Sequence, residues 1–199
     1  PDQIVVRLRA ALTNEGGEFH EDALIFRFLN NNDTGPRFIT RHGAELEMVA
    51  AALLLTLPGI PCIYTGQEVG AEFEPYRTPG PITWDDAHGL RDYYRRLIAL
   101  RQGTPALRSR DWQLLRVRSA QQCLAYLRRA GEQRALVVLN FSPGKATAEV
   151  TVGKAFAEVA GKAELFDLLA DRKVTAAESA PGKLRLALPP ASARIIVAR

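Results

Sequence analysis

Two groups of polar residues follow directly after short apolar segments, as side chains at the ends of buried strands do. Asn31, Asn32 and Asp33 come shortly after the apolar run at residues 23–29, and a polar pair at residues 67–68 follows a second short run. In an α/β barrel the carboxyl ends of the strands form the active-site face, and residues there carry the chemistry. Asn and Asp are also common in turns and at helix caps, so a purely structural interpretation stays open.

The first half of the chain alternates between expected helices and expected short strands. Apolar spacing predicts helices at residues 4–12, 44–57 and 90–98, and strands at residues 23–29 and 59–64. This order indicates parallel strands joined by crossover helices. Two such strands do not make a stable sheet alone, because both faces and both edges need covering. The first half therefore looks like part of something larger.

The sequence changes character near residues 103–105, after which short strands are separated by Gly and Pro turn signals. Regular short strands with such turns indicate an antiparallel sandwich. The predicted strands lie at residues 112–118, 123–128, 135–140, 146–152, 164–168, 183–188 and 193–197.

Composition excludes several classes of protein. The two cysteines, Cys62 and Cys123, make no disulfide framework, and with three scattered histidines they make no zinc site. The longest apolar run, residues 48–57, is shorter than the roughly 20 residues of a membrane span. We expect no metal, no cofactor and no membrane partner. A cytoplasmic location is favoured, although the chain opens with Pro1 rather than Met and its true N-terminus is expected to be absent.

The chain carries a formal net charge of +4, and many of its arginines lie between residues 91 and 110. A nucleic-acid surface is one interpretation, and it predicts salt-sensitive binding. The favoured interpretation is a solvated, arginine-rich helix face, because the sequence has no glycine-rich phosphate loop and no zinc-finger spacing. We therefore expect no nucleic-acid partner.

Several segments resemble, in the correct order, conserved segments of the α-amylase family (glycoside hydrolase family 13). Residues 28–37, Phe-Leu-Asn-Asn-Asn-Asp-Thr-Gly-Pro-Arg, are similar to the family's Phe-x-x-Asn-His-Asp segment followed by Arg. Residues 57–70 resemble its eighth-strand segment, Gly-x-Pro-x-x-Tyr-x-Gly-x-Glu. The style is that of neopullulanases and cyclomaltodextrinases. Further similar segments lie at residues 77–85, 93–101, 105–108, 124–128, 137–142 and 186–193.

This resemblance implies an α/β plus all-β fold. Residues 1–104 would be the final βα units of a (β/α)₈ TIM barrel, with strands 7 and 8 and their flanking helices, and residues 105–199 an antiparallel β-sandwich domain C. It also implies a retaining glycosidase or transglycosylase acting on starch, maltooligosaccharides or cyclodextrins. Retention requires a nucleophile and an acid about 5–5.5 Å apart. In the family these groups follow the fourth and fifth strands, so we expect the isolated chain to hydrolyse nothing.

The resemblance assigns roles to four residues. Asp33 matches the family's third carboxylate, which accepts hydrogen bonds from sugar hydroxyls as the transition state forms. Asn32 stands where the family has His, and an amide carries no charge near neutral pH. Arg37 follows Asp33 by four residues instead of the three expected for the family, which changes the direction in which its side chain is expected to point. Asn31, Asn32 and Arg37 are expected to bind substrate.

Two further interpretations stay open. A carbohydrate-binding fragment or pseudoenzyme of the same family would bind maltooligosaccharides without cleaving them, as the change at Asn32 suggests. An arginine-rich interaction module is the third class. Because a parallel edge is otherwise exposed, we expect the chain to associate with itself or with the missing barrel portion. Tyr76 and Trp84 are candidates for stacking on sugar rings, whereas packing is favoured for Tyr64.

Overall fold

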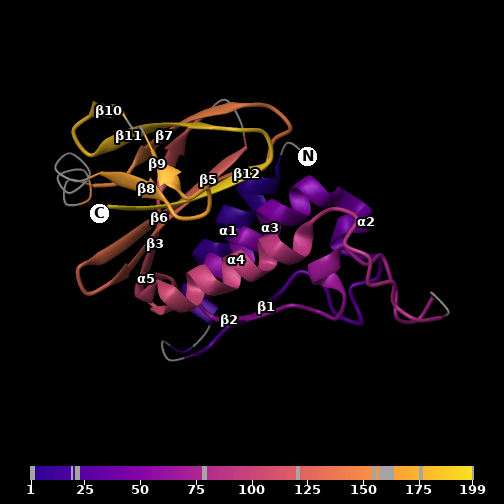
Figure 1. The fold of residues 1–199 in the computed structure, drawn as a ribbon. Helices are drawn as coiled ribbons and strands as arrows, with labels where there is room; N and C mark the ends of the chain where they lie inside the picture. Colours follow the sequence, from indigo (N-terminus) through magenta and orange to yellow (C-terminus); the bar gives the residue numbers. More distant parts are fainter. Residues whose placement is uncertain are drawn as a thin grey trace.

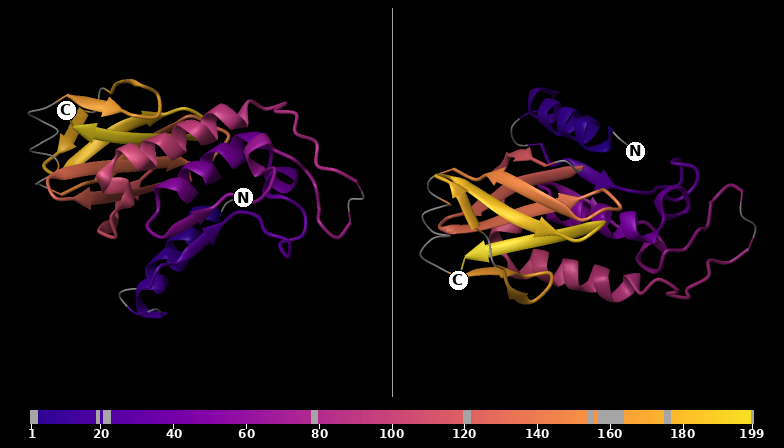
Figure 2. Two further views of the ribbon diagram at one scale, coloured as in Figure 1. Left: turned by 60° about the horizontal axis from the view of Figure 1, so that its bottom comes forward. Right: turned by 90° about the horizontal axis from the view of Figure 1, so that it is seen from above.

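The computed structural model describes residues 3–18, 20, 23–77, 80–119, 122–153, 156, 164–174 and 177–198. Figure 1 shows three layers: a β-sandwich, a layer of helices, and a pair of short strands on the far side of the helices. The helical layer contains α1 (Ile4–Glu18), α3 (Ala44–Thr56) and α4 (Leu90–Gly103). In Figure 2, α1 and α4 lie on opposite sides of α3.

The predicted parallel strand pair is present. Strand β1 (Phe26–Phe28) pairs in parallel with β2 (Ile60–Cys62), with Phe26 opposite Ile60. Both strands are only three residues long, shorter than the predicted segments at residues 23–29 and 59–64. The two strands meet closely at their start, where a Cβ atom on Gly59 would lie 2.4 Å from the carbonyl oxygen of Ile25. Glycine is therefore required at that position.

Shorter helices connect these elements. They are α2 (Phe38–His42) after β1, the 3₁₀-helix η1 (Gln67–Val69) after β2, and α5 (Pro105–Arg108) after α4. Helix α1 continues to Glu18, whereas the sequence predicted an end before Gly16; glycine lowers helix propensity by only about 1 kcal/mol and does not forbid the helix.

The second half forms two antiparallel sheets, as predicted. The six-stranded sheet has the order β3-β5-β6-β12-β8-β9, and the four-stranded sheet has the order β10-β11-β7-β4. The strands are β3 (Trp112–Leu114), β4 (Arg116–Arg118), β5 (Cys123–Ala130), β6 (Gln133–Asn140), β7 (Ala146–Thr151), β8 (Leu165–Asp167), β9 (Arg172–Lys173), β10 (Ala177–Ala180), β11 (Lys183–Leu188) and β12 (Ser192–Ala198).

Two details of the sandwich correct the sequence prediction. The single strand predicted at residues 112–118 is broken at Leu115, and its two parts, β3 and β4, join different sheets. Leu115 is buried in the sandwich core, so the chain changes sheet where an apolar side chain turns inward. Strands β9 and β10 were not predicted, because β9 has only two residues, both exposed.

The six-stranded sheet is covered on both faces. One face meets the four-stranded sheet, and the other meets the helical layer, where Leu124, Tyr126 and Val137 join a core with residues of α3 and α4. Six consecutive residues of β5 are buried for this reason, whereas β11 alternates between buried and exposed positions. The two halves predicted from the sequence therefore share one apolar core.

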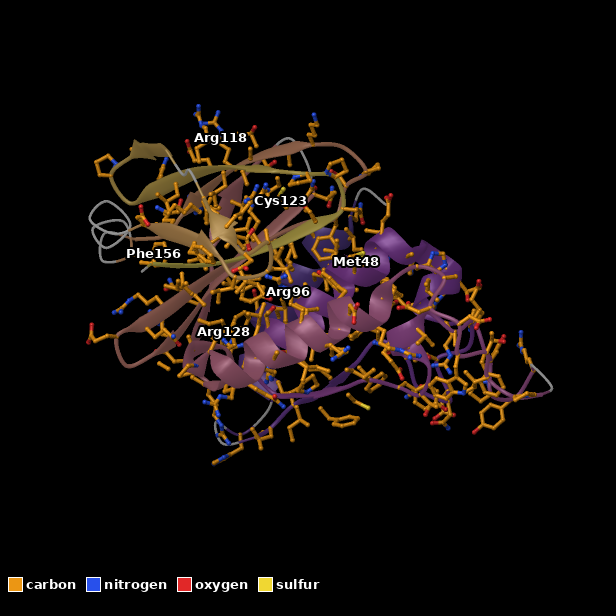
Figure 3. The ribbon with its side chains drawn as sticks, in the orientation of Figure 1. Met48, Arg96, Arg118, Cys123, Arg128 and Phe156 are labelled. Atoms are coloured by element: carbon orange, nitrogen blue, oxygen red, sulfur yellow. The ribbon has the colours of Figure 1, made fainter. Side chains whose placement is uncertain are left out.

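Two arginines bind the carbonyl groups at the C-terminal end of α3. Arg128, buried on β5 near α5 (Figure 3), donates to the carbonyl oxygens of Thr56, Leu107 and Ser109. Arg101 on α4 donates to the carbonyl oxygens of Leu55 at 2.9 Å, Leu57 at 3.0 Å and Gly59 at 2.7 Å. Arg91, Arg95 and Arg96 are exposed, as predicted for a solvated helix face, but Arg101 is not part of that face.

Candidate functional site

The loop at residues 31–37 joins β1 to α2 at the carboxyl end of the strand pair. It begins after Asn30, which is 2% exposed. The Asn30 side chain accepts a hydrogen bond from the backbone N–H of Phe38 at 2.7 Å and donates one to Gln67 Oε1 at 2.8 Å. Asn30 therefore ties the start of the loop to its end and to η1.

Hydrogen bonds within the loop turn two side chains outward. The Asp33 backbone N–H donates to Asn31 Oδ1 at 2.8 Å, and the Asn31 backbone N–H donates to Thr34 Oγ1 at 3.1 Å. In this Asx turn the Asn31 side-chain oxygen is engaged in a hydrogen bond with the backbone. The side chains of Asn32 and Asp33 remain exposed.

Asn32 links the Asp33 carboxylate to an aromatic residue. Its Nδ2 group donates to Asp33 Oδ1 at 3.1 Å and to the Tyr76 hydroxyl oxygen at 3.0 Å. Tyr76 comes from the long loop before α4 and is 76% exposed. An accessible carboxylate, amide and phenol thus lie together, and they can exchange hydrogen bonds with a ligand rich in hydroxyl groups.

The structure does not bring Arg37 into this exposed group. Arg37 is 1% exposed, and its Nε and Nη2 atoms donate to the carbonyl oxygens of Phe73 at 2.5 Å and Thr65 at 3.1 Å. Its guanidinium lies 4.5 Å from the ring centroid of Tyr64. Burial lowers the pKa of Arg37, and the charges of Tyr64 and Glu47 oppose this effect. Arg37 therefore holds the loop after β2 against α2.

The extra residue in the loop has a structural reason. Gly35 has φ of +71°, a left-handed conformation that other residues adopt rarely. The chain can thus turn inward between Asp33 and Arg37, so that Asp33 stays at the surface while Arg37 enters the interior.

A chain of buried polar side chains lies beneath the loop. Gln67 Nε2 donates to the Tyr94 hydroxyl oxygen at 2.7 Å, and that hydroxyl donates to Glu47 Oε1 at 2.7 Å. Burial raises the pKa of Glu47 to about 6, opposed by the hydrogen bond from Tyr94 and the charge of Arg37. The pKa of Tyr94 is also raised, by burial and by the Glu47 carboxylate.

Sequence patterns did not predict these buried hydrogen-bonded side chains, although they placed Gln67 in a polar pair after the second strand. One signal was present: Glu47 is an acidic residue inside a helix whose other residues at positions 49–55 are all apolar. A buried charged residue of this kind needs partners. Tyr94 donates a hydrogen bond to Glu47 Oε1, whereas Oε2 has no hydrogen-bond partner among the described residues and is helped only by the charge of Arg37.

The aromatic candidates divide into packed and accessible residues. Tyr64 lies beneath Arg37, which agrees with the packing role preferred for it. Tyr76 and Trp84 are 76% and 52% exposed, and both belong to the long loop between η1 and α4. Only the latter two are placed to meet a ligand from solvent.

A pocket of about 390 Å³ lies at the opposite, amino end of the strand pair. Its lining includes Glu15 and Arg27, which form an ion pair at 2.7 Å, and the pocket also borders Trp112. Arg27 additionally donates to the carbonyl oxygen of Pro58 at 2.6 Å. Because both charges are already engaged, this pocket is a weaker candidate than the exposed loop.

Neither a metal centre nor a membrane segment is found in the described part of the chain. There, no group of three or more His, Cys, Asp or Glu residues could hold a metal ion. Within the same residues, no helix combines the length and apolar character that crossing a membrane requires.

Comparison with known sequences finds similarity to amylases. The family described as Maltogenic Amylase, C-terminal domain, matches residues 112–195. The Alpha-amylase MalA of Haloarcula japonica is 32% identical over 142 residues, which cover 68% of this chain and 20% of MalA. A Cyclomaltodextrinase of Bacillus sp. is 32% identical over 124 residues, covering 59% of this chain and 22% of that protein. The chain thus spans about a fifth of the length of these relatives.

Solved structures have the same fold. The debranching enzyme of Nostoc punctiforme, soaked with acarbose, matches 100% of this chain and 39% of its own, with a TM-score of 0.75 and 25% identity. The resemblance to the C-terminal part of family 13 glycoside hydrolases, of the maltogenic amylase and cyclomaltodextrinase type, is thereby confirmed.

Proposed function

From the resemblance of this chain to the C-terminal part of α-amylase-family glycoside hydrolases, we propose that it forms that part of a retaining enzyme acting on α-glucans. Residues 1–104 would close the catalytic barrel, with β1 and β2 as its last two strands, and residues 105–199 would be domain C. The parallel pairing of β1 and β2 supports this assignment. The similarity to MalA also supports it. That similarity extends over 142 residues, which is longer than the segment at residues 112–195 that matches the C-terminal domain family.

The exposed Asp33 carboxylate is the observation on which the proposal rests. It lies at the carboxyl end of β1, in a loop held at both ends, beside the Asn32 amide and the Tyr76 phenol. Hydrogen bonds between Asp33 and sugar hydroxyls would strengthen as the oxocarbenium-like transition state forms, and such bonds supply several kcal/mol. Asp33 is thus the transition-state-stabilising residue, and Asn31 and Asn32 are substrate-binding residues.

Arg37 would contribute to substrate binding indirectly, because its side chain is buried. Its buried guanidinium holds the segment from Thr65 to Phe73, and that segment leads to Tyr76. We propose that it sets the position of Tyr76 relative to Asp33, which replaces the direct contact implied by the family pattern.

The relatives' names suggest the substrate class. Two are called cyclomaltodextrinase and another maltogenic alpha-amylase. We propose starch, maltooligosaccharides or cyclodextrins as the substrate, with hydrolysis or transfer as the reaction. Retention needs a nucleophile and an acid as well, and in the family that this chain resembles these two groups follow the fourth and fifth barrel strands, whereas β1 and β2 are proposed to be the last two. The isolated chain is therefore proposed to be inactive.

A second function is favoured by one observation. Asn32 replaces the family's His, and its amide is already engaged with Asp33 and Tyr76. A site with such an amide can bind hydroxyl groups without providing the usual contact to the transition state. A pseudoenzyme that binds maltooligosaccharides is therefore the alternative proposal.

The test uses the complete gene product and the variant Asp33→Asn. We expect the variant to cleave maltotriose or β-cyclodextrin at least about 100-fold more slowly, the factor typical of losing one transition-state contact, with a smaller change in KM. The matched control is Asp92→Asn, an exposed aspartate on α4 whose ion pair with Arg95 lies at the surface. Equal activity of Asp33→Asn and wild type would refute the proposal. Binding of these sugars without any cleavage would favour the pseudoenzyme instead.

A further inference from the structure

The hydrogen bonds beneath the loop at residues 31–37 all run in one direction. The backbone N–H of Phe38 donates to Asn30, Asn30 donates to Gln67, Gln67 donates to Tyr94, and Tyr94 donates to Glu47. A backbone N–H donates and never accepts. The chain therefore has a fixed donor at one end and needs an acceptor at the other, and that acceptor is the Glu47 carboxylate.

Glu47 also acts on the other end of the loop. The two side chains form no ion pair within 4.0 Å, and Arg37 Nη1 and Glu47 Oε2 are buried without hydrogen-bond partners among the described residues, but the positive charge of Arg37 favours the ionised Glu47 carboxylate. Arg37 is the N-terminal cap residue of α2 and is the last residue of the loop. One buried carboxylate, 1% exposed on α3, thus acts through hydrogen bonds on Asn30 and through its charge on Arg37.

We propose that Glu47 is the positioning residue of the Asp33 loop, holding both of its ends at once when its carboxylate is ionised. The effect of this positioning on sugar cleavage rests on the proposed function, whereas the positioning of the loop by Glu47 does not. A hydrogen bond to an ionised acceptor is about twice as strong as one between neutral groups. Protonation of Glu47 therefore weakens the anchor at Asn30 and removes the charge attraction at Arg37.

The surroundings of Glu47 limit what else can produce this effect. Tyr94 faces it from α4, and Arg37 faces it from the start of α2. The other charged groups on α2, Arg41 and His42, act on each other. Behind α3, β6 and β12 contribute apolar side chains to the shared core. The raised pKa of Glu47, about 6, places its protonation within the range in which many enzymes are assayed.

The test is an NMR titration of the 199-residue chain over about pH 5 to 8. In the wild type, the side-chain amide signals of Asn30 and Gln67 and the backbone amide of Asp33 should shift with one common midpoint near 6. The hydrogen-exchange protection factor of the Phe38 amide should fall about fivefold below that midpoint, the factor that one hydrogen bond provides.

Three variants make the result specific. Glu47→Gln keeps an oxygen that accepts from Tyr94 but has no charge, so at high pH it should resemble the acidified wild type and show no transition of these signals. Glu45→Gln, on the exposed face of the same helix, should behave like wild type. His42→Gln removes a second titratable group, an imidazole whose ring centroid lies 4.4 Å from that of Phe38. The proposal requires that this variant still show the transition.

Two results would overturn the proposal: a transition that persists in Glu47→Gln, or signals of Asn30, Gln67 and Asp33 that do not share a midpoint. Neither depends on sugar. If the chain shows the transition but the complete gene product neither binds nor cleaves maltotriose, only the proposed function is refuted.

Discussion

At the scale of single residues, Glu47 combines a cost in stability with a contribution to local order. Burial disfavours its ionised form, and only part of this cost is offset by Tyr94 and Arg37. Side chains at functional sites often lower the stability of the fold in this way. The loop that carries Asp33 is thus held in place by a group whose ionised state costs free energy.

The cost has a measurable pH dependence. The folded-state pKa of about 6 is above the ordinary value of 4.5, so the folded chain takes up this proton first as the pH falls. Ionised Glu47 therefore lowers the free energy of unfolding by about 2 kcal/mol above pH 6, and this loss disappears by pH 4.5. Glu47→Gln should be more stable than wild type by about that amount at neutral pH and similar to it in acid.

Urea unfolding at a series of pH values measures this difference, because the other carboxyl groups titrate equally in both proteins and cancel. A difference between Glu47→Gln and wild type that stays constant over the whole range would show that Glu47 has an ordinary pKa.

Sequence patterns located the exposed part of the candidate site but not its support. Asn31, Asn32 and Asp33 were found because polar residues after a strand are visible in the sequence. The burial of Arg37 was not predicted, since the effect of Gly35 on its direction depends on backbone conformation. The link from Asn30 through Gln67 to Tyr94 was not predictable either, because these three residues come together only through tertiary packing.

At the scale of elements, the C-terminal end of α3 is the point where the helical layer and the six-stranded sheet are joined. The last carbonyl groups of a helix have no partners within it. Here the guanidinium groups of Arg101 and Arg128 supply the donors, and the Tyr126 hydroxyl lies 2.5 Å from Thr56 Oγ1. Among the described residues, Arg128 donates hydrogen bonds to carbonyl groups, and burial lowers its pKa to about 10.

Arg128→Met should lower the free energy of unfolding by about 3 kcal/mol, because it removes the guanidinium donor from the buried carbonyl groups of Thr56 and Leu107 and from the partly buried carbonyl group of Ser109. Arg128→Lys should recover only part of this loss, since an ammonium group on a flexible stem does not match the fork of the guanidinium. Arg91→Met, on the exposed face of α4, is the control and should change stability by less than about 0.5 kcal/mol. Thermal or urea unfolding checks all three, and equal stability of Arg128→Met and wild type would exclude the joining role.

Element types were predicted better than element ends. The apolar character of α3 on nearly every face indicated a buried helix, and short strands with turns indicated antiparallel sheets. The break at Leu115 was missed although the sequence carries a signal for it, because the two consecutive leucines at positions 114 and 115 interrupt the apolar–polar alternation of residues 112–118. Arg101 was assigned to solvent from its position near the end of an amphipathic helix, whereas its long side chain reaches back to α3.

At the scale of the whole molecule, the outer face of the β1–β2 pair is the most apolar exposed region described. Phe26, Phe28 and Ile60 are 58%, 41% and 45% exposed, and Leu24 beside them is 54% exposed. Within the described residues, strands β1 and β2 pair with each other and with no further strand, so each leaves an edge without a neighbouring strand there. Such a face and such edges favour the addition of further strands.

The isolated chain should therefore self-associate as its concentration rises. Phe26→Lys combined with Ile60→Lys should lower the apparent mass measured by light scattering, since charged side chains on exposed strands oppose pairing. Val6→Lys is the matched control, because Val6 on α1 is 63% exposed but lies outside this face. A wild-type chain that stays monomeric at high concentration, or a Val6 variant with the same effect, would contradict this prediction.

The double covering of the six-stranded sheet has a consequence for inheritance. Leu124, Tyr126, Val137 and Ile195 contact the helical layer from the sheet, so an exchange of gene segments between related enzymes at the border near residue 105 would bring together two surfaces that had not evolved as a pair. Recombinants crossed there should be selected against unless the donor's α3 and α4 travel with its β-sandwich.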